Sequence, residues 1–224
     1  MQLLDVQLDS SILNIALDEA LLEQADSSDC EEVLRIWEPP ETIVVVGRSS
    51  PIEQEVKLDI CRHRQVDVFR RSSGGATIAA APGCLMYTVL LDYRRRPQLR
   101  MLEQAHQFVM NHMREAIRSL NVPAEIAGIC DLVVDGRKFS GNALRCKRNW
   151  MFYHGTILCE SFDLGIVEQL LGSPKRQPEY RKRRSHRDFL TSIPASSPQV
   201  RKDIIDQWGV DQIQLEWPEQ LQKS

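Results

Sequence analysis

The sequence DLVVDGRKFSGNA at residues 131–143 contains the strongest hairpin signal of the chain. An apolar run ends at Asp135-Gly136, a dipeptide that favours the tight turn between two antiparallel strands. Residues 151–158, MFYHGTIL, have the composition of a further strand. The region therefore predicts an antiparallel sheet, with Arg137 and Lys138 just beyond a turn.

Other segments extend this sheet and surround it with helices. Strand patterns cover residues 33–37, 42–48, 66–71 and 85–91, helix patterns cover 11–25, 101–121 and 163–171, and a short helix followed by a strand is expected over 199–217. The strands come in hairpin-like pairs without regular alternation of strand and helix. This order predicts an α+β fold with a mixed or antiparallel sheet and flanking helices, rather than a doubly wound one.

Length and composition indicate an ordinary globular protein of one domain over residues 1–224. The formal charge of −3 argues against a general nucleic-acid binder, and no apolar run is long enough for a membrane span. The start of the chain is unlike a signal peptide, so we expect a cytoplasmic protein with no nucleic-acid or membrane partner. The six cysteines are scattered without metal-ligand spacing, which predicts reduced thiols and no metal site.

The stretch RRSSGGAT at residues 70–77 has the chemistry of an anion-binding loop. Adjacent glycines after a strand let the backbone approach a ligand, and Arg70 and Arg71 can neutralise phosphate or carboxylate. Side chains alternate along a strand, so only one of the two arginines can face the ligand. The plain alternative is a β-turn with exposed charge.

Two further positions are candidates, each with a structural alternative. Lys138, held in a cleft, can stabilise developing negative charge, although a solvated lysine after a turn is the commoner case. The run Tyr153-His154-Gly155-Thr156 contains a glycine within a strand, which often marks a close approach of backbone or ligand. His154 by itself is more often a hydrogen-bonded core histidine.

Taken together, these segments resemble a known family. NIALDEALL at 14–22, IVVVGR at 43–48, RRSSGGAT, DGRKFSGNA and HGT occur in this order. The set resembles the biotin/lipoate protein ligase catalytic domain over residues 10–172, most closely the lipoate–protein ligase A type. Biotin ligases usually carry a GRGRxGRxW loop, and RRSSGGAT is the lipoate form. The resemblance implies a fold like that of class II aminoacyl-tRNA synthetases and biotin synthetase.

The resemblance also implies a reaction. Lipoate or octanoate would react with ATP, supplied as its Mg²⁺ complex, to give an acyl-adenylate. The acyl group would then pass to a lysine on a lipoyl domain of a 2-oxoacid dehydrogenase complex or on glycine-cleavage H protein, in some members with a separate accessory subunit. Lys138 would be the catalytic lysine. The residues carried over for substrate and ATP binding are Arg70, Arg71, Ser73, Gly74, Gly75, Ala76, Thr77, Ile78, Ala143, His154, Gly155 and Thr156.

The chain departs from the family pattern in places. Ala76 replaces a third glycine, and Ala80-Ala81 replaces a frequent His-Asp. Residues 173–198 are expected to be a basic loop, mobile or ordered during function, and 199–224 a short tail with no accessory domain. Within this part, residues 175–189 concentrate positive charge. That charge predicts docking of an acidic carrier or closure over phosphates, the alternative being a solvated loop.

Two other functions stay open. An octanoyltransferase would take its acyl group from acyl carrier protein through a cysteine thioester without ATP, and Cys130 and Cys84 are the candidate nucleophiles. The loop where the classical transferase has its cysteine reads LLGSPKR here, with Ser173 and no cysteine. The second alternative is a non-catalytic module that binds a lipoyl carrier.

Overall fold

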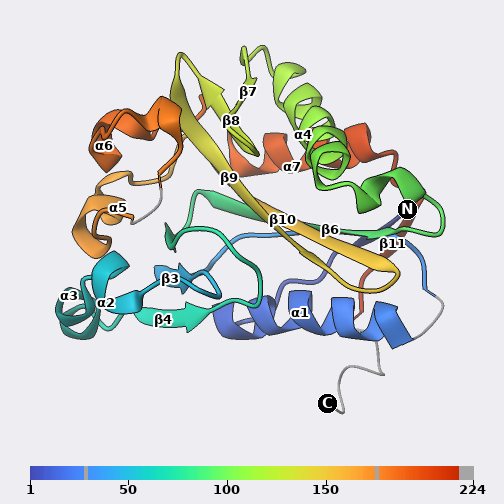
Figure 1. The fold of residues 1–224 in the computed structure, drawn as a ribbon, viewed down its shortest axis with the longest axis horizontal. Helices are drawn as coiled ribbons and strands as arrows, with labels where there is room; N and C mark the ends of the chain where they lie inside the picture. The colour runs from blue at the N-terminus through green and yellow to red at the C-terminus, as the bar shows by residue number, and fades with distance from the viewer. Residues whose placement is uncertain (28–29, 175–176, 217–224) are drawn as a thin grey trace.

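The computed structural model describes residues 1–27, 30–174 and 177–216. Its main sheet has eight strands in the order β11-β1-β2-β6-β10-β9-β8-β7 (Figure 1). They are β1 (Gln2–Leu4), β2 (Val33–Trp37), β6 (Cys84–Asp92), β7 (Glu125–Ala127), β8 (Asp131–Val134), β9 (Arg137–Cys146), β10 (Trp150–Leu158) and β11 (Gln212–Gln214). β1 pairs in parallel with β2 and β11, and the other pairs are antiparallel. The predicted α+β fold with a mixed sheet is confirmed.

A smaller sheet stands beside the main one. It has the order β4-β3-β5, from β4 (Asp67–Arg70), β3 (Ile43–Val46) and β5 (Ile78–Ala80). β3 is buried along its whole length, as its unbroken run of β-branched residues predicts. Because β4 and β5 flank residues 71–77, this sheet fixes both ends of the glycine loop.

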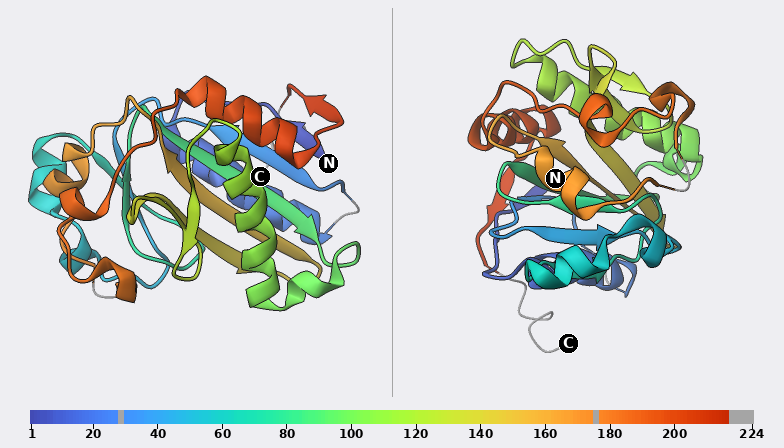
Figure 2. Two further views of the ribbon diagram at one scale, coloured as in Figure 1. Left: turned by 90° about the horizontal axis from the view of Figure 1, so that it is seen from above. Right: turned by 90° about the vertical axis from the view of Figure 1, so that its left-hand side faces the viewer.

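Helices cover both faces of the main sheet (Figures 1 and 2). α1 (Ser11–Ser27) packs on one face, where Leu17 and Leu22 join a core cluster with strand residues. α4 (Leu102–Arg118) and α7 (Ser197–Trp208) pack against each other on the opposite face. α4 buries one apolar stripe, including Ala105 and Val109, as its helical spacing predicts.

Several short elements are invisible to sequence periodicity. They are α2 (Ile52–Glu55), α3 (Leu58–His63), the 3₁₀ turns η1 (Pro97–Arg100) and η2 (Glu179–Arg181), and α6 (His186–Phe189). One or two turns of helix are too short to show a repeat. By contrast, α5 (Gly165–Leu170) lies within the helix predicted over 163–171.

The expected basic loop is more structured than its composition suggests. Its described residues carry η2 and α6 and lie along the start of β9. The amide of Thr191 donates to the carbonyl of Lys138 at 2.9 Å, and the guanidinium of Arg184 donates to the carbonyl of Gly136 at 3.0 Å. Lys175 and Arg176 lie outside the described residues, as do residues 217–224 at the end of the expected tail. Within the described parts, no helix is long and apolar enough to span a bilayer.

Candidate active site

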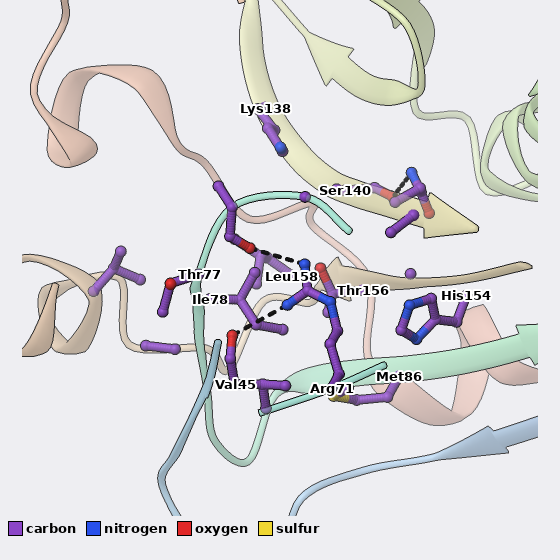
Figure 3. A pocket seen from close by; sticks show the side chains of 18 of the residues that line it. Val45, Arg71, Thr77, Ile78, Met86, Lys138, Ser140, His154, Thr156 and Leu158 are labelled. Atoms are coloured by element: carbon purple, nitrogen blue, oxygen red, sulfur yellow. Dashed lines mark hydrogen bonds between the residues drawn. The ribbon is translucent and has the colours of Figure 1, made fainter. Parts of the chain in front are cut away.

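A pocket lies between the two sheets and is closed on one side by residues 181–190. The space between its walls, counted together with the solvent at its mouth, is about 1200 Å³. Of the residues predicted for the site, its wall contains Lys138, Arg71, Gly75, Ala76, Thr77, Ile78, Ala143, His154, Gly155 and Thr156. Segments far apart in the sequence therefore meet around one space (Figure 3).

Arg71 shapes the glycine loop. Its side chain is nearly buried, with the residue 8% exposed. The guanidinium donates to the carbonyls of Val45 at 3.1 Å, Gly74 at 2.7 Å and Ala76 at 2.9 Å. Burial lowers the pKa of Arg71 to about 10, so the group is still charged at neutral pH. The loop curls around a cation, and Gly75, at φ 91°, permits the turn.

Arg70 faces away from the pocket, as strand alternation requires once Arg71 points inward. Its guanidinium donates to the carbonyls of Gly47 at 2.7 Å, Arg48 at 3.2 Å and Ser50 at 3.1 Å. Arg70 is not among the residues that line the pocket. Its side chain binds the turn at residues 47–50, so the structure does not bring it to the ligand side where the resemblance placed it.

Two carboxylates that sequence reasoning missed hold the ends of the loop. Glu19 of α1 accepts the amide of Ser72 at 2.7 Å. Glu55 of α2 accepts both the amide and the hydroxyl of Thr77, at 3.0 and 2.7 Å. Glu19 lies in the NIALDEALL stretch, which gave a signal, whereas nothing in the sequence around Glu55 indicates its role. These acceptors fix the backbone that would carry a ligand.

His154 is linked to the loop through Ser73. Its Nε2 lies 2.6 Å from the Ser73 hydroxyl, which itself accepts from Arg71 Nε at 3.1 Å. Burial and the nearby charge of Arg71 lower the pKa of His154 to about 3, so the imidazole is neutral. Ser73 and Gly74 do not line the pocket, so Ser73 acts through its neighbours.

A glycine is required at position 155 because neighbouring side chains occupy the place of a Cβ. A Cβ there would lie 1.7 Å from Oδ1 of Asn142 on the paired strand and 2.8 Å from the ring of Tyr87. Asn142 occupies this space because its amide also donates to the carbonyl of Cys130 at 2.6 Å. The sequence associated Gly155 with a ligand, but in the structure this glycine makes room for the side chains of Asn142 and Tyr87 beside the pocket.

Lys138 points from β9 toward the pocket (Figure 3). Its Nζ lies 2.8 Å from Oδ1 of Asp131, and Oδ2 of the same carboxylate accepts the Tyr180 hydroxyl at 2.6 Å. A Cβ at Gly141 would lie 2.7 Å from Nζ, so this glycine leaves room for the amine. Lys138 is therefore fixed at the pocket wall by an ion pair, and it is not a freely solvated lysine after a turn.

The remaining wall is largely apolar. It includes Ile15, Trp37, Val45, Met86, Phe152 and Leu158. Asp18 also lines it, but its carboxylate is paired with Arg35 at 2.7 Å and accepts Trp37 Nε1 at 3.1 Å. An apolar slot beside a fixed glycine loop and a lysine suits an amphipathic ligand with an acidic end.

The two candidate thiols lie outside the pocket wall. Cys84 is fully enclosed, and burial raises the pKa of its thiol strongly. Burial raises the pKa of Cys130 to about 11, and its Sγ lies 3.2 Å from the carbonyl of Asn142. Cys84 is buried and Cys130 half-buried, neither lines the pocket, and a protonated thiol is a poor nucleophile, so the structure does not bring either cysteine to the site. Across the described chain, no group of three or more His, Cys, Asp or Glu side chains is placed to hold a metal.

Comparison with known families agrees with this geometry. The family described as lipoyl protein ligase A/B catalytic domain matches residues 11–208, and the chain belongs to it. The match reaches beyond residue 172, so it includes the segment around η2 and α6. The resemblance to lipoate–protein ligase A is confirmed.

The individual relatives carry the names of two different enzyme activities. Lipoate-protein ligase A of Bdellovibrio bacteriovorus is 28% identical over 215 residues, covering 92% of this chain and 59% of the relative. Octanoyltransferase LipM of Geobacillus kaustophilus is 27% identical over 202 residues, covering 79% of this chain and 70% of the relative. The chain spans about two fifths of the length of several other curated relatives.

Solved structures share the fold. A bi-partite lipoate protein ligase from Thermoplasma acidophilum, studied with its E2 lipoyl domain, has a TM-score of 0.81 at 19% identity, over 99% of this chain and 88% of that one. A lipoate-protein ligase A bound with ATP has a TM-score of 0.76 at 19% identity, over 99% and 91%.

Proposed function

We propose that this chain is the catalytic domain of a lipoate–protein ligase. It would activate lipoate or octanoate with ATP, supplied as its Mg²⁺ complex, and transfer the acyl group to a lysine of a carrier domain. The observation that carries the proposal is the single pocket wall that combines the Arg71-centred loop, Lys138 and an apolar slot. The ATP-bound state of one structural neighbour supports the nucleotide part.

Each part of the wall has a role in this reaction. The apolar slot would hold the acyl tail, and Gly75 and Ala76 of the loop would present backbone amides to the adenylate. Lys138 would neutralise charge on the phosphate and carbonyl oxygens as the mixed anhydride forms and breaks. Arg71 and His154 are positioning residues here, because their hydrogen bonds to Gly74, Ala76 and Ser73 fix the loop.

The octanoyltransferase is the second candidate because one relative carries that name. It needs a nucleophilic thiol within reach of the acyl group. Among the described residues that line the pocket there is no cysteine, which favours the ligase. The binding-module alternative is disfavoured by the place of Lys138, which lies in the pocket wall beside the glycine loop with its Nζ 2.8 Å from Asp131.

The acceptor is proposed as a lipoyl domain or glycine-cleavage H protein, with an accessory subunit as a further partner. The lipoyl domain studied with one structural neighbour supports this choice. Lys182 and Arg183 are exposed on consecutive left-handed residues, at φ 50° and 58°, and project positive charge beside the pocket. Such a feature suits an acidic carrier surface.

A paired acylation assay tests the proposal. One arm contains lipoate, Mg·ATP and an apo lipoyl domain or H protein, and the other contains octanoyl carrier protein and the same acceptor without ATP. Intact mass spectrometry reads the acceptor. We expect modification only in the ATP arm, lost in Lys138→Ala. Modification only from octanoyl carrier protein would establish the transferase. No activity of the wild-type protein in either arm, together with carrier binding that Lys138→Ala leaves unchanged, would favour the binding module.

A further inference from the structure

Arg181 is a buried cation in the wall of the pocket, on the basic segment for which carrier docking, closure over phosphates and a solvated loop were all open. The residue is 5% exposed and lines the pocket together with His186 and Phe189. It follows Tyr180, whose hydroxyl binds the carboxylate that also holds Lys138. Arg181 and Lys138 therefore belong to two elements joined through Asp131, and both face the same space.

The guanidinium of Arg181 is held in one orientation. Its Nε donates to the carbonyl of Arg184 at 3.1 Å, and its Cζ lies 4.8 Å from the centroid of the Phe189 ring. Its Nη2 lies 3.4 Å from Nδ1 of His186. Because Nε2 of His186 lies 3.0 Å from the carbonyl of Gly172, it carries the proton, and Nδ1 is left as an acceptor. Burial lowers the pKa of His186, so the ring is neutral and does not repel the arginine.

No carboxylate within residues 1–27, 30–174 and 177–216 forms an ion pair with Arg181. A buried charge without an opposite charge is costly, and proteins keep such a group where it has a task. Arg184 differs, because its guanidinium donates to the carbonyls of Gly136, Tyr180 and Arg181 and serves the local structure. Arg181, by contrast, lines the pocket.

We propose that Arg181 is a phosphate-binding residue, with its guanidinium fork facing the anionic end of the substrate opposite the glycine loop. A rigid guanidinium binds phosphate oxygens through two parallel hydrogen bonds. The inference rests on the proposed function for its first source of phosphate, the leaving pyrophosphate of ATP. The second source is the phosphate of an acyl-phosphopantetheine arm, which a transferase would receive. The chemistry at Arg181 is the same in both.

Direct binding by calorimetry separates the sources. The probes are pyrophosphate, ATP and phosphopantetheine, each measured with wild type, Arg181→Met, Arg181→Lys and Arg187→Gln. Methionine keeps the packing on Phe189 and removes the charge. Arg187 is exposed on the same segment and absent from the pocket wall, so Arg187→Gln is a matched control for loss of one positive charge.

We expect Arg181→Met to weaken binding of the bound probe at least about tenfold, and Arg187→Gln to change it less than about twofold. Arg181→Lys should retain part of the affinity, and it serves as the test if the methionine variant does not fold by circular dichroism. Equal affinity in wild type and both Arg181 variants, equal losses in Arg181→Met and Arg187→Gln, or no binding of any probe to wild type would overturn the proposal. If phosphopantetheine is the only probe that binds and its binding depends on Arg181, the phosphate site is supported and the ligase function is rejected. If acylation depends on ATP but probe binding does not depend on Arg181, the ligase function is supported and the phosphate site is rejected.

Discussion

Gly141→Ala should move Lys138, the lysine we propose to be catalytic, without removing it. The new Cβ would lie 2.7 Å from Nζ and 2.8 Å from Cε of Lys138, against an ordinary contact near 3.4–4 Å. The amine must therefore shift by about 1 Å, because backbone pairing with Thr156 holds residue 141 in place. A misplacement of about 1 Å lowers a reaction rate by about 10²-fold, or about 2.7 kcal/mol of transition-state stabilisation.

The fold should survive this substitution. The φ of Gly141 is not in the left-handed region, and the atoms that must yield are the end of a flexible side chain. The assay is single-turnover acylation of a lipoyl domain, with thermal melting in parallel. We expect a single-turnover rate constant about 10²-fold lower, with a melting temperature within a few degrees of wild type.

A matched glycine distinguishes this effect from a general one. Gly165 lies outside the pocket wall, and a Cβ there would meet the side chain of Asp163 at 3.0 Å. Gly165→Ala should keep the wild-type rate constant. A fully active Gly141→Ala variant would show that the position of the lysine amine against Gly141 and Asp131 is irrelevant to the rate, and the reasoning would fail.

Three further predictions follow from charge and burial. The pKa of His154 is about 3 in the folded chain and 6.5 in the unfolded chain, so between these values the unfolded chain binds an extra proton. This group therefore lowers the free energy of unfolding by about 1.4 kcal/mol for each pH unit below 6.5. Denaturant melts of His154→Gln should lack this slope, and parallel curves of stability against pH for the two proteins would contradict it. Iodoacetamide at pH 8 should label exposed Cys146 first and leave acylation unchanged, whereas loss of activity in step with labelling of Cys130 would favour the thioester route. Replacing Lys182 and Arg183 together by Glu should raise KM for the acceptor about tenfold at low salt and keep kcat, and a KM that does not depend on salt would reject docking at this surface.

The last of these predictions refines an expectation from the sequence. Charge alone gives no reason to prefer one arginine of the basic segment over another. In the structure, Arg184 donates to backbone carbonyls, so its reversal would disturb the fold as well as any partner. Lys182 and Arg183 carry exposed charge and are the cleaner pair.

Long elements and local motifs were accessible from the sequence, because periodicity and turn chemistry act over neighbouring residues. The Asp135-Gly136 hairpin, the long helix ending at Arg118 and the strand containing His154 all form where the pattern indicates. The choice between Arg70 and Arg71 was not accessible. Alternation shows that they differ, but the direction depends on which face of the chain at the end of β4 is turned to the pocket, a long-range property.

Partners distant in the chain were also beyond reach. Glu55 holds Thr77 from a four-residue helix, and Tyr180 reaches Asp131 across 49 positions. Neither contact has a sequence pattern, since each depends on how the two sheets and the C-terminal segment pack. For the same reason Cys130 could be nominated from its nearness to Lys138 in sequence and Cys84 from its place just after Pro82-Gly83, while the burial of both thiols came only from the structure.

Exchange of labelled pyrophosphate into ATP, without any acceptor, tests the central claim most directly. The account predicts exchange that requires lipoate in wild type and falls at least about 10²-fold in Lys138→Ala, because the lysine acts where oxyanion charge develops. Both proteins should melt alike. Lipoate-dependent exchange that is unchanged in Lys138→Ala, or acceptor acylation from carrier protein with no exchange at all, would contradict it.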